Sequence, residues 1–267
     1  MNTNNGISIF QNRFSGENLF FTSDTHFCHE NIIKFCNRPF GSVKEMNEVL
    51  IHNWNETVPE DGTVFHLGDF AFGGAAEWCS VMNRLNGRIF LILGNHDFFL
   101  QELGEKNSPT SVMKHLLPGP HKGQSKLVYL CDNSVEIDGI RIYGTPWIAD
   151  LARWAFYKPE DELVEIYDRI PQRCDILLTH MPPLACDAGR VLQHGNFNTM
   201  ADYGSLELAE AISARDINYA LCGHVHTGNH FPEPFGNVKN IVNVSLKDEN
   251  YKVAFKPFNF EIWDSPR

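Results

Sequence analysis

The chain has 267 residues, of which 43% are hydrophobic and 20 are Phe. This is the composition of a globular protein that can bury most of its apolar surface, and no apolar run is long enough to span a bilayer. The formal net charge of −11 disfavours extended nucleic acid bound through its phosphates, but not a small phosphorylated substrate, because bound divalent cations can reverse the local field.

The N-terminal half predicts strands that alternate with helices. The polar residues 1–7 lack the features of a secretory signal, which favours a cytoplasmic protein. Strands are expected near residues 20–22, 63–67 and 88–93, and helices over 29–36, 42–54 and 75–85. Ser42 and Glu45 have the spacing of a capping box at the start of the second helix. This order predicts a βαβαβ unit with a parallel sheet.

The second half predicts a mixed sheet. Residues 106–123 are expected to form a surface excursion, and Asp138-Gly139 a hairpin turn between strands at 134–137 and 140–143. Helices are expected over 159–170 and 205–214, and further strands over 127–130, 174–179, 217–222, 241–244 and 251–258. The polar segment 184–204 predicts a long lid loop. No linker divides the chain, which predicts a single domain over residues 1–267.

Five predicted strands end in side chains that commonly bind metals. These are Asp24 and His26, Asp69, Asn95 to Asp97, His180, and His224 with His226. Ligands of α/β proteins gather beyond the carboxyl ends of the strands, and alternation along an extended chain would put Asp24 and His26 on one side. Glycines at 68, 94 and 223 fit tight turns through which the backbone approaches a bound group.

The series resembles the calcineurin-like metallophosphoesterases. Its elements are Asp24-x-His26, Gly68-Asp69, Gly94-Asn95-His96-Asp97, His180 and Gly223-His224-x-His226. The resemblance extends from about residue 20 to 226. The opening, which continues to His29 and Asn31, is also similar to a subgroup of small bacterial and phage-encoded members. In that subgroup Gly usually stands at the position of Cys28, a departure at the mouth of the site that removes no ligand.

The resemblance implies an α/β fold, a four-layer α/β/β/α sandwich with mixed sheets, and two divalent metal ions. The implied ligands of the first ion are Asp24, His26 and His226, those of the second are Asn95, His180 and His224, and Asp69 bridges the two. Mn²⁺ is the expected ion, and Fe, Zn²⁺, Ni²⁺ or Mg²⁺ also suit such a site. His96 is implied as general acid or charge stabiliser, oriented by Asp97.

The expected activity is hydrolysis of phosphate mono- or diesters, most plausibly small nucleotide-like or cyclic phosphates. A hydroxide that bridges two ions would attack phosphorus in line, without a covalent enzyme intermediate. Two alternatives stay open: a nuclease acting on DNA or RNA ends, and a binding scaffold that has lost turnover. No membrane partner is expected, and the oligomeric state is open.

Several polar and aromatic side chains near these motifs have two interpretations. His29 and Asn31 either contact a substrate phosphate or cap a helix. The cationic side chains either pair with a phosphate or are solvated: Arg38, Arg190 and His194. Trp147 and Tyr203 either stack on a base or pack in the core or lid. His66 is expected to pack within the fold, and Cys28 is either a thiolate ligand or a neutral bystander.

Overall fold

The computed structural model describes residues 19–106, 126–137, 139–193 and 199–246. Four parallel strands form the first sheet, in the order β1-β2-β3-β4. Their bounds are β1 Leu19–Thr22, β2 Thr63–His66, β3 Arg88–Leu91 and β4 Leu127–Tyr129. The helices around them are α2 Glu30–Phe35, α3 Val43–Thr57, α4 Ala75–Met82 and α5 Phe98–Lys106. The predicted βαβαβ unit is therefore present.

The second sheet has six strands in the order β11-β12-β10-β7-β6-β5. Its inner strands β12, β10, β7 and β6 run parallel, and the edge strands β11 and β5 pair antiparallel with their neighbours. The bounds are β5 Asn133–Ile137, β6 Ile140–Thr145, β7 Arg173–Thr179, β10 Asp216–Cys222, β11 Glu233–Phe235 and β12 Val238–Asn243. Two helices accompany this sheet, α7 Glu160–Tyr167 and α8 Leu206–Ser213. The sheet is mixed, as predicted.

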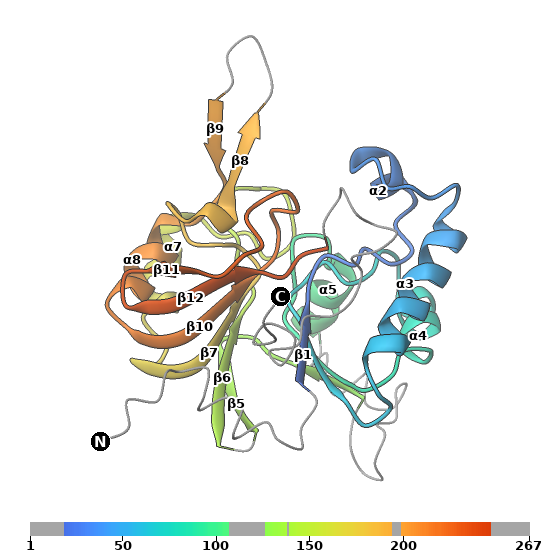
Figure 1. Cartoon of the computed structure of the whole chain (residues 1–267), viewed down its shortest axis with the longest axis horizontal. Helices are drawn as coiled ribbons and strands as arrows, with labels where there is room; N and C mark the ends of the chain where they lie inside the picture. The colour runs from blue at the N-terminus through green and yellow to red at the C-terminus, as the bar shows by residue number, and fades with distance from the viewer. Residues whose placement is uncertain (1–18, 107–125, 138, 194–198, 247–267) are drawn as a thin grey trace.

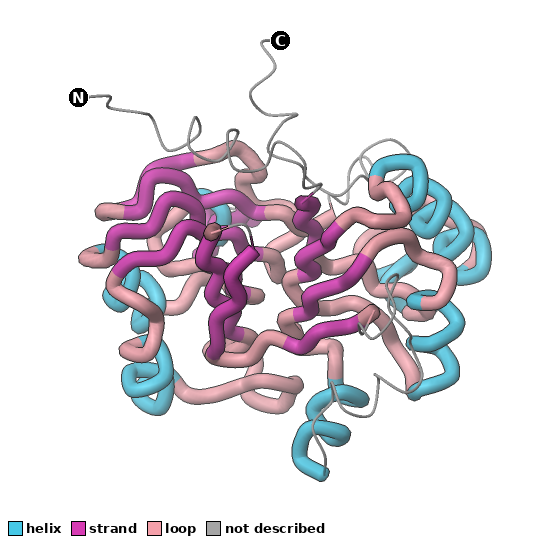
Figure 2. Tube along the Cα trace, turned by 90° about the horizontal axis from the view of Figure 1, so that it is seen from below, coloured by secondary structure: helices cyan, strands magenta, loops and turns pink. Residues whose placement is uncertain are grey.

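Three apolar cores define four layers. Alternate side chains of β1, such as Phe21, meet side chains of β7 and β10, such as Leu178 and Leu221, in a core between the two sheets. Phe20, on the other face of β1, packs with α3 and α4, and the outer face of the second sheet packs with α7 and α8. Helices lie outside both sheets (Figures 1 and 2). This arrangement confirms the predicted α/β/β/α sandwich.

Helix starts follow the local sequence. The Ser42 hydroxyl accepts a hydrogen bond from the backbone N of Glu45 at 3.2 Å, as the capping-box spacing predicts. The Glu45 carboxylate accepts from the backbone N of Gly41 at 2.8 Å, one residue before the expected partner. Ser205 caps α8 in the same way, accepting from the backbone N of Leu208 at 3.1 Å.

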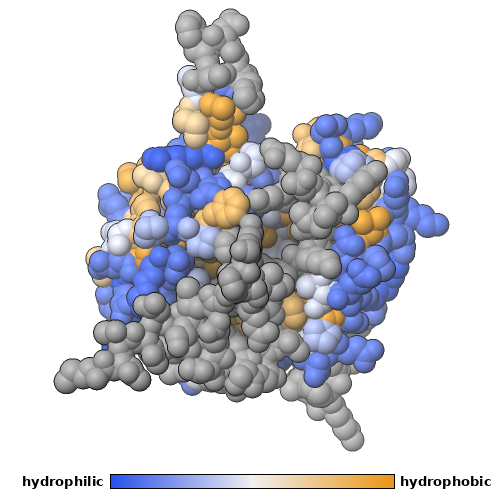
Figure 3. Space-filling model, in the orientation of Figure 1, coloured by the Kyte–Doolittle hydropathy of each residue, from blue (hydrophilic) through white to orange (hydrophobic). Residues whose placement is uncertain are grey.

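The segment 184–204 is not the long loop that the sequence predicts. It contains a short 3₁₀ helix, Asp187–Gly189, and an antiparallel hairpin of β8 Arg190–Gln193 and β9 Thr199–Asp202. The hairpin projects from the body (Figure 1), and apolar atoms are visible on it (Figure 3), where Leu192 and Met200 are exposed. The strands were not predicted because the segment is polar and contains glycine. Two exposed strands do not need the alternation of apolar and polar residues that marks a half-buried strand.

Some predictions concern residues outside the described ranges. They are the strand at 251–258 and most of the excursion at 106–123, of which Lys106 is the last residue of α5. The short edge strand β11 was not predicted. Among the described helices, none combines the length and apolar character that crossing a membrane requires.

Candidate metal centre

The structure brings the seven predicted metal ligands to one edge of the two sheets. They follow the carboxyl ends of β1, β2, β3, β7 and β10. Five of them are buried carboxylates, amides or imidazoles with at most 3% exposure: Asp24, His26, Asp69, Asn95 and His180. The side chains of His224 and His226 are 9% and 12% exposed. Parallel strands in both sheets make this convergence possible, because their ends share an edge.

One group of donor atoms gathers around Asp24. His226 Nε2 lies 3.2 Å from Asp24 Oδ1 and 3.3 Å from His26 Nε2. His26 Nε2 is in turn 3.7 Å from Asp69 Oδ2. One donor atom each from Asp24, His26 and His226 lies within 4.8 Å of the others, a spacing that a single cation can fill.

A second group gathers around Asn95. Its Oδ1 lies 3.0 Å from His180 Nε2 and 2.9 Å from His224 Nδ1. His180 Nε2 is also 3.6 Å from Asp69 Oδ1. The two oxygens of Asp69 thus face different groups, Oδ2 toward His26 and Oδ1 toward His180. One carboxylate therefore lies between the two groups of donor atoms.

Three of these imidazoles are held through the nitrogen that points away from the cluster. His180 Nδ1 donates to the Leu67 carbonyl at 2.7 Å, and His224 Nε2 lies 3.1 Å from Asp150 Oδ2. His226 Nδ1 lies 3.6 Å from Cys36 Sγ. Metal-binding histidines usually have such outer partners, which fix the tautomer and the ring plane. Neither Asp150 nor Cys36 was predicted as a site residue, because neither belongs to a strand-end motif.

Comparison with known proteins agrees with this site. The sequence matches the calcineurin-like phosphoesterase family over residues 18–228. The chain belongs to this family.

Relatives of this phosphoesterase include proteins from distant organisms. An uncharacterized protein of Methanocaldococcus jannaschii is 48% identical over 90 residues, which are 33% of this chain and about half, 49%, of that protein. A UPF0046 protein of Caenorhabditis elegans is 28% identical over 84% of this chain and 80% of its own length. Among solved structures, a protein of unknown function from Aquifex aeolicus has a TM-score of 0.47 and 21% identity, covering 92% of this chain and 97% of that one.

The phosphoesterase site is built on unusual backbone conformations. Asp24, His26, Asp69 and His224 all have positive φ, between 51° and 66°, as does Cys28 at 62°. Residues other than glycine rarely adopt this left-handed region, and such strain persists at sites that the surrounding fold enforces. The prediction that Asp24 and His26 share a side through extended alternation is therefore wrong. Left-handed turns direct both side chains into the cluster.

Arg38 holds the first of these turns. Its guanidinium donates to the carbonyl oxygens of Thr25 at 2.8 Å and Asp24 at 3.0 Å, and the side chain is 3% exposed. The interpretation of Arg38 as a solvated side chain is therefore wrong. Its hydrogen bonds support the Asp24 turn. Arg38 is not among the residues that line the described pocket, and its contact with a phosphate stays a prediction.

Asp97 connects two loops of the site. Its carboxylate accepts hydrogen bonds from the backbone N atoms of Asp69, Phe70 and Gly94 at 2.8, 3.0 and 2.8 Å. Burial and the charge of Asp69 raise the pKa of Asp97 well above its ordinary value, against the effect of these donors. In the described residues the carboxylate makes no bond to the His96 ring. Asp97 therefore fixes the loops that carry Asp69 and His96, and does not orient the imidazole directly as predicted.

The predicted glycines make room for site side chains and not only for a bound group. Gly68 has φ of 105°, and a Cβ there would lie 2.5 Å from His180 Nδ1. A Cβ on Gly94 would collide with Asp69 and His180, and one on Gly223 with Ser23 and Asp24. Neighbouring strand ends can approach one another this closely only without side chains at the three positions.

Burial and neighbouring charges shift the pKa values of the titratable side chains in the site. Burial lowers the pKa values of His26 and His180, and that of His96 to about 3, so these rings are neutral. Burial and then the charge of Asp24 raise the pKa of Asp69 to about 7. Burial also acts upward on Asp24, but the hydrogen bond and charge of His226 outweigh it and lower the pKa of Asp24. Two crowded carboxylates beside three neutral imidazoles form a site that divalent cations would stabilise.

A pocket of about 690 Å³ opens beside the cluster. Its polar lining includes His26, Asp69, Asn95, His224 and His226, together with His29 and His96. Another part of the lining is aromatic and partly exposed, with Phe72 at 48%, Phe98 at 38% and Trp154 at 39%. The His96 ring contacts both parts. It packs edge-on against the Trp154 ring, with the ring centroids 4.4 Å apart, and its Nε2 is 3.9 Å from Asp69 Oδ2.

Of the weaker candidates, only His29 lies in the pocket lining. Asn31 is exposed on α2, and Arg190 on β8 pairs with Asp187 and Asp202, both at 3.3 Å. His194 lies outside the described residues. The described residues of segment 184–204 do not line the pocket either, and its role as a lid stays a prediction.

The remaining candidates have structural contacts. The Trp147 indole donates to Asp132 at 2.8 Å and packs on Phe156. The Tyr203 hydroxyl accepts from Gln193 on the projecting hairpin. His66 is buried and bonded to Thr25, as its packing interpretation requires. Burial raises the pKa of the Cys28 thiol, and Asn47 donates to its sulfur, which favours the neutral bystander.

Proposed function

We propose that this phosphoesterase hydrolyses small phosphate mono- or diesters with two divalent cations. The position of Asp69 carries the proposal, because its two oxygens face two separate groups of nitrogen and oxygen donors. Asp24, His26 and His226 would hold one ion, and Asn95, His180 and His224 the other. The bound ions would supply an activated water and neutralise charge on the phosphoryl oxygens.

The donor set supports ions of intermediate hardness. It contains imidazole nitrogens and carboxylate or amide oxygens, a mixture that suits Mn²⁺, Fe or Zn²⁺. Cys36, the nearest thiol, faces the outer nitrogen of His226 and is not directed at the cluster. We therefore propose Mn²⁺ as the first ion to test.

His96 is proposed to act on the leaving group. Its backbone N donates to Asp69 Oδ1 at 2.8 Å, which ties the residue to the centre of the cluster, while its ring lies in the pocket lining. From there the imidazole can donate a hydrogen bond to the oxygen that leaves phosphorus, as a general acid or as a stabiliser of its charge. Asp97 would act by holding the loop in place.

The pocket supports a small ester with an apolar or planar organic group, such as a nucleotide-like or cyclic phosphate. Trp154 and Phe98 offer exposed rings beside His96, and aromatic rings stack on bases of any sequence. Arg153 adds one cationic side chain to this lining. The net charge of −11 counts against an extended nucleic acid.

Turnover of chromogenic esters tests the proposal. The Mn²⁺-loaded protein should cleave bis(p-nitrophenyl) phosphate or p-nitrophenyl phosphate, and excess EDTA should abolish the activity. Cleavage of oligonucleotide ends alone would favour the nuclease instead. A loaded protein that cleaves none of these esters would favour the binding scaffold and refute the proposal.

A further inference from the structure

His29 is a buried histidine whose ring has no hydrogen-bond partner among the described residues. It is only 6% exposed, and its Nδ1 is fully buried and unpaired. It occupies the N-cap position of α2 but makes no capping hydrogen bond, so the helix-cap interpretation is wrong. Folded proteins rarely leave buried polar atoms unpaired, and each such atom calls for an explanation.

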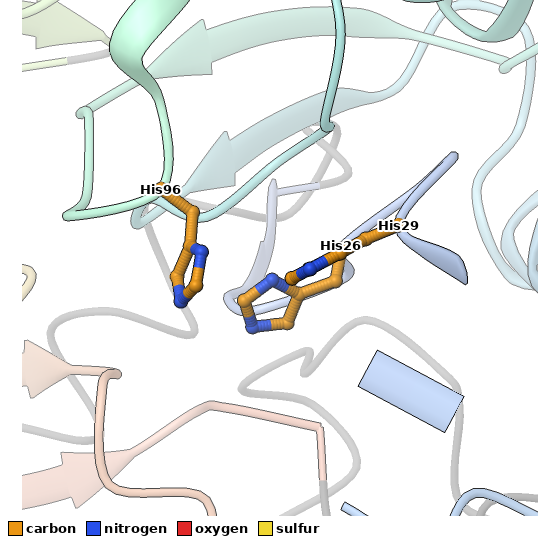
Figure 4. A group of neighbouring side chains, drawn as sticks. All are labelled: His26, His29 and His96. Carbon is orange, nitrogen blue, oxygen red and sulfur yellow. The ribbon is translucent and has the colours of Figure 1, made fainter. Parts of the chain in front are cut away.

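The surroundings fix the ring at the wall of the pocket. Its face stacks on Phe72, with centroids 4.8 Å apart and an angle of 14° between the planes. The ring centroid is 5.6 Å from that of His26 and 5.3 Å from that of His96. The three rings come from the loops after β1 and β3 and lie next to one another (Figure 4). The His26 and His96 rings are themselves 4.9 Å apart, so His29 lies beside both a proposed metal ligand and the proposed leaving-group residue.

The two ring nitrogens have different environments. A ring that is 6% exposed, stacks on Phe72 and lies beside two further imidazoles is neutral and carries one proton. A buried N–H without an acceptor is less tolerable than an unpaired lone pair, which places the proton away from the buried Nδ1. Nε2 is then the donor, and it belongs to a side chain that lines the pocket.

We propose that His29 Nε2 donates a hydrogen bond to a non-bridging oxygen of the substrate phosphoryl group, next to His96. This inference rests on the proposed function. Two divalent ions against the two carboxylates Asp24 and Asp69 leave the site with excess positive charge, which attracts a phosphoryl anion and repels a third cation. A donor N–H suits the anion and cannot bind a cation. His29 would thus fix the orientation of the phosphoryl group without holding a metal.

The variant His29→Phe tests this contact, because it keeps a ring to stack on Phe72 and removes both nitrogens. The probe is inorganic phosphate, added to the Mn²⁺-loaded protein. Its inhibition constant should rise roughly 10- to 100-fold, as expected for the loss of a hydrogen bond to a charged group. The melting temperature without phosphate should not fall, because the removed nitrogens have no partner. At the same phosphate concentration, the melting temperature should rise less in the variant than in the wild type.

Two matched histidines serve as controls. His52→Phe changes an exposed side chain on α3, 68% accessible, and should alter neither phosphate inhibition nor melting. His66→Phe removes a buried ring whose two nitrogens bond to Thr25 Oγ1 and the backbone N of Gly68. Its melting temperature should fall, in contrast to that of His29→Phe.

Each outcome decides the inference. Unchanged phosphate inhibition in His29→Phe would overturn it, and so would loss of a bound Mn²⁺, which would make His29 a metal ligand. Should the phenylalanine variant not fold, His29→Leu takes the same phosphate titration. A wild type that cleaves no ester, yet is stabilised by phosphate only when His29 is present, would refute the proposed function and leave the phosphate contact standing.

Discussion

The pocket has two walls that are built in opposite ways. In the polar wall, His26, Asp69 and Asn95 are almost completely buried, and hydrogen bonds hold their positions from several directions. In the aromatic wall, Phe98 and Trp154 are more than a third exposed, and ring contacts hold them in place. Catalysis by fixed charges requires positions that do not relax, whereas recognition of an organic group can use an exposed surface.

The backbone shows the same division. Non-glycine residues with positive φ include His26, Asp69 and His224 of the polar wall, and neither Phe98 nor Trp154. Such conformations need surrounding contacts that enforce them, here the hydrogen bonds from Arg38 and to Asp97. Changes in the polar wall should therefore remove the activity altogether, and changes in the aromatic wall should alter the choice of substrate.

The largest effect should come from Asp69→Asn. The amide keeps the shape but removes the charge shared by both donor groups, so metal content should fall at both positions. Turnover should decrease about 1,000-fold or more, because each ion contributes several kcal/mol of charge stabilisation. Metal analysis of the purified protein and turnover of p-nitrophenyl esters measure the two effects.

In the absence of metal, Asp69→Asn should not destabilise the fold, although it should abolish most of the turnover. Burial and Asp24 raise the pKa of Asp69 to about 7. Above that pH the ionised carboxylate destabilises the metal-free fold, and the neutral amide does not. Melting at pH 8 in EDTA should therefore show no loss relative to the wild type. The exposed Asp61→Asn serves as the control, and an unchanged metal content in Asp69→Asn would refute the shared position.

His96→Ala should have the next largest effect and separate chemistry from metal binding. Both ions should remain bound, while turnover falls by roughly 10²- to 10⁴-fold, the range typical for a general acid. The loss should be greater for alkyl esters than for p-nitrophenyl esters, because a poor leaving group depends more on a donated proton. Metal analysis together with kcat for both ester types measures this, and a variant that loses metal would disprove the assignment.

The convergence of these candidate ligands could be predicted from sequence because their positions follow from a simple rule. Apolar runs fix the strands, parallel pairing aligns the strand ends, and Asp69 or His180 follows such an end directly. The residues that hold these side chains in place cannot be predicted from the local sequence. Asp150 reaches His224 across 74 residues of chain, and Asp97 binds backbone N atoms of a loop 27 and 28 residues earlier. Contacts at that separation depend on the order of the strands within each sheet.

Dependence on distant contacts also explains which predictions from the sequence were wrong or missing. Asp24 and His26 have left-handed backbone conformations that Arg38 and neighbouring loops enforce. The local sequence contains no sign of these contacts, so an extended backbone was predicted. The hairpin of β8 and β9 projects from the body and buries little, which removes the apolar alternation that would reveal it. The aromatic wall combines the start of α5 with the loop after β6, and neither carries a motif.

Trp154→Ala should have the smallest effect and a selective one. Loss of a stacking surface should lower kcat/KM about tenfold for esters with a base or another planar group, since such stacking contributes ~1–3 kcal/mol. Small alkyl phosphodiesters, which cannot reach the ring, should be cleaved as before. Phe231→Ala, at an exposed aromatic side chain outside the pocket lining, is the matched control.

The pattern across substrates matters more than the size of the Trp154→Ala effect. A fall restricted to planar substrates would place the ring in recognition and keep the two walls separate in function. A uniform fall for all esters would mean that Trp154 acts by holding the His96 ring, 4.4 Å away. In that case the aromatic wall would belong to the catalytic geometry, and the substrate specificity of this phosphoesterase would have to arise elsewhere in the pocket.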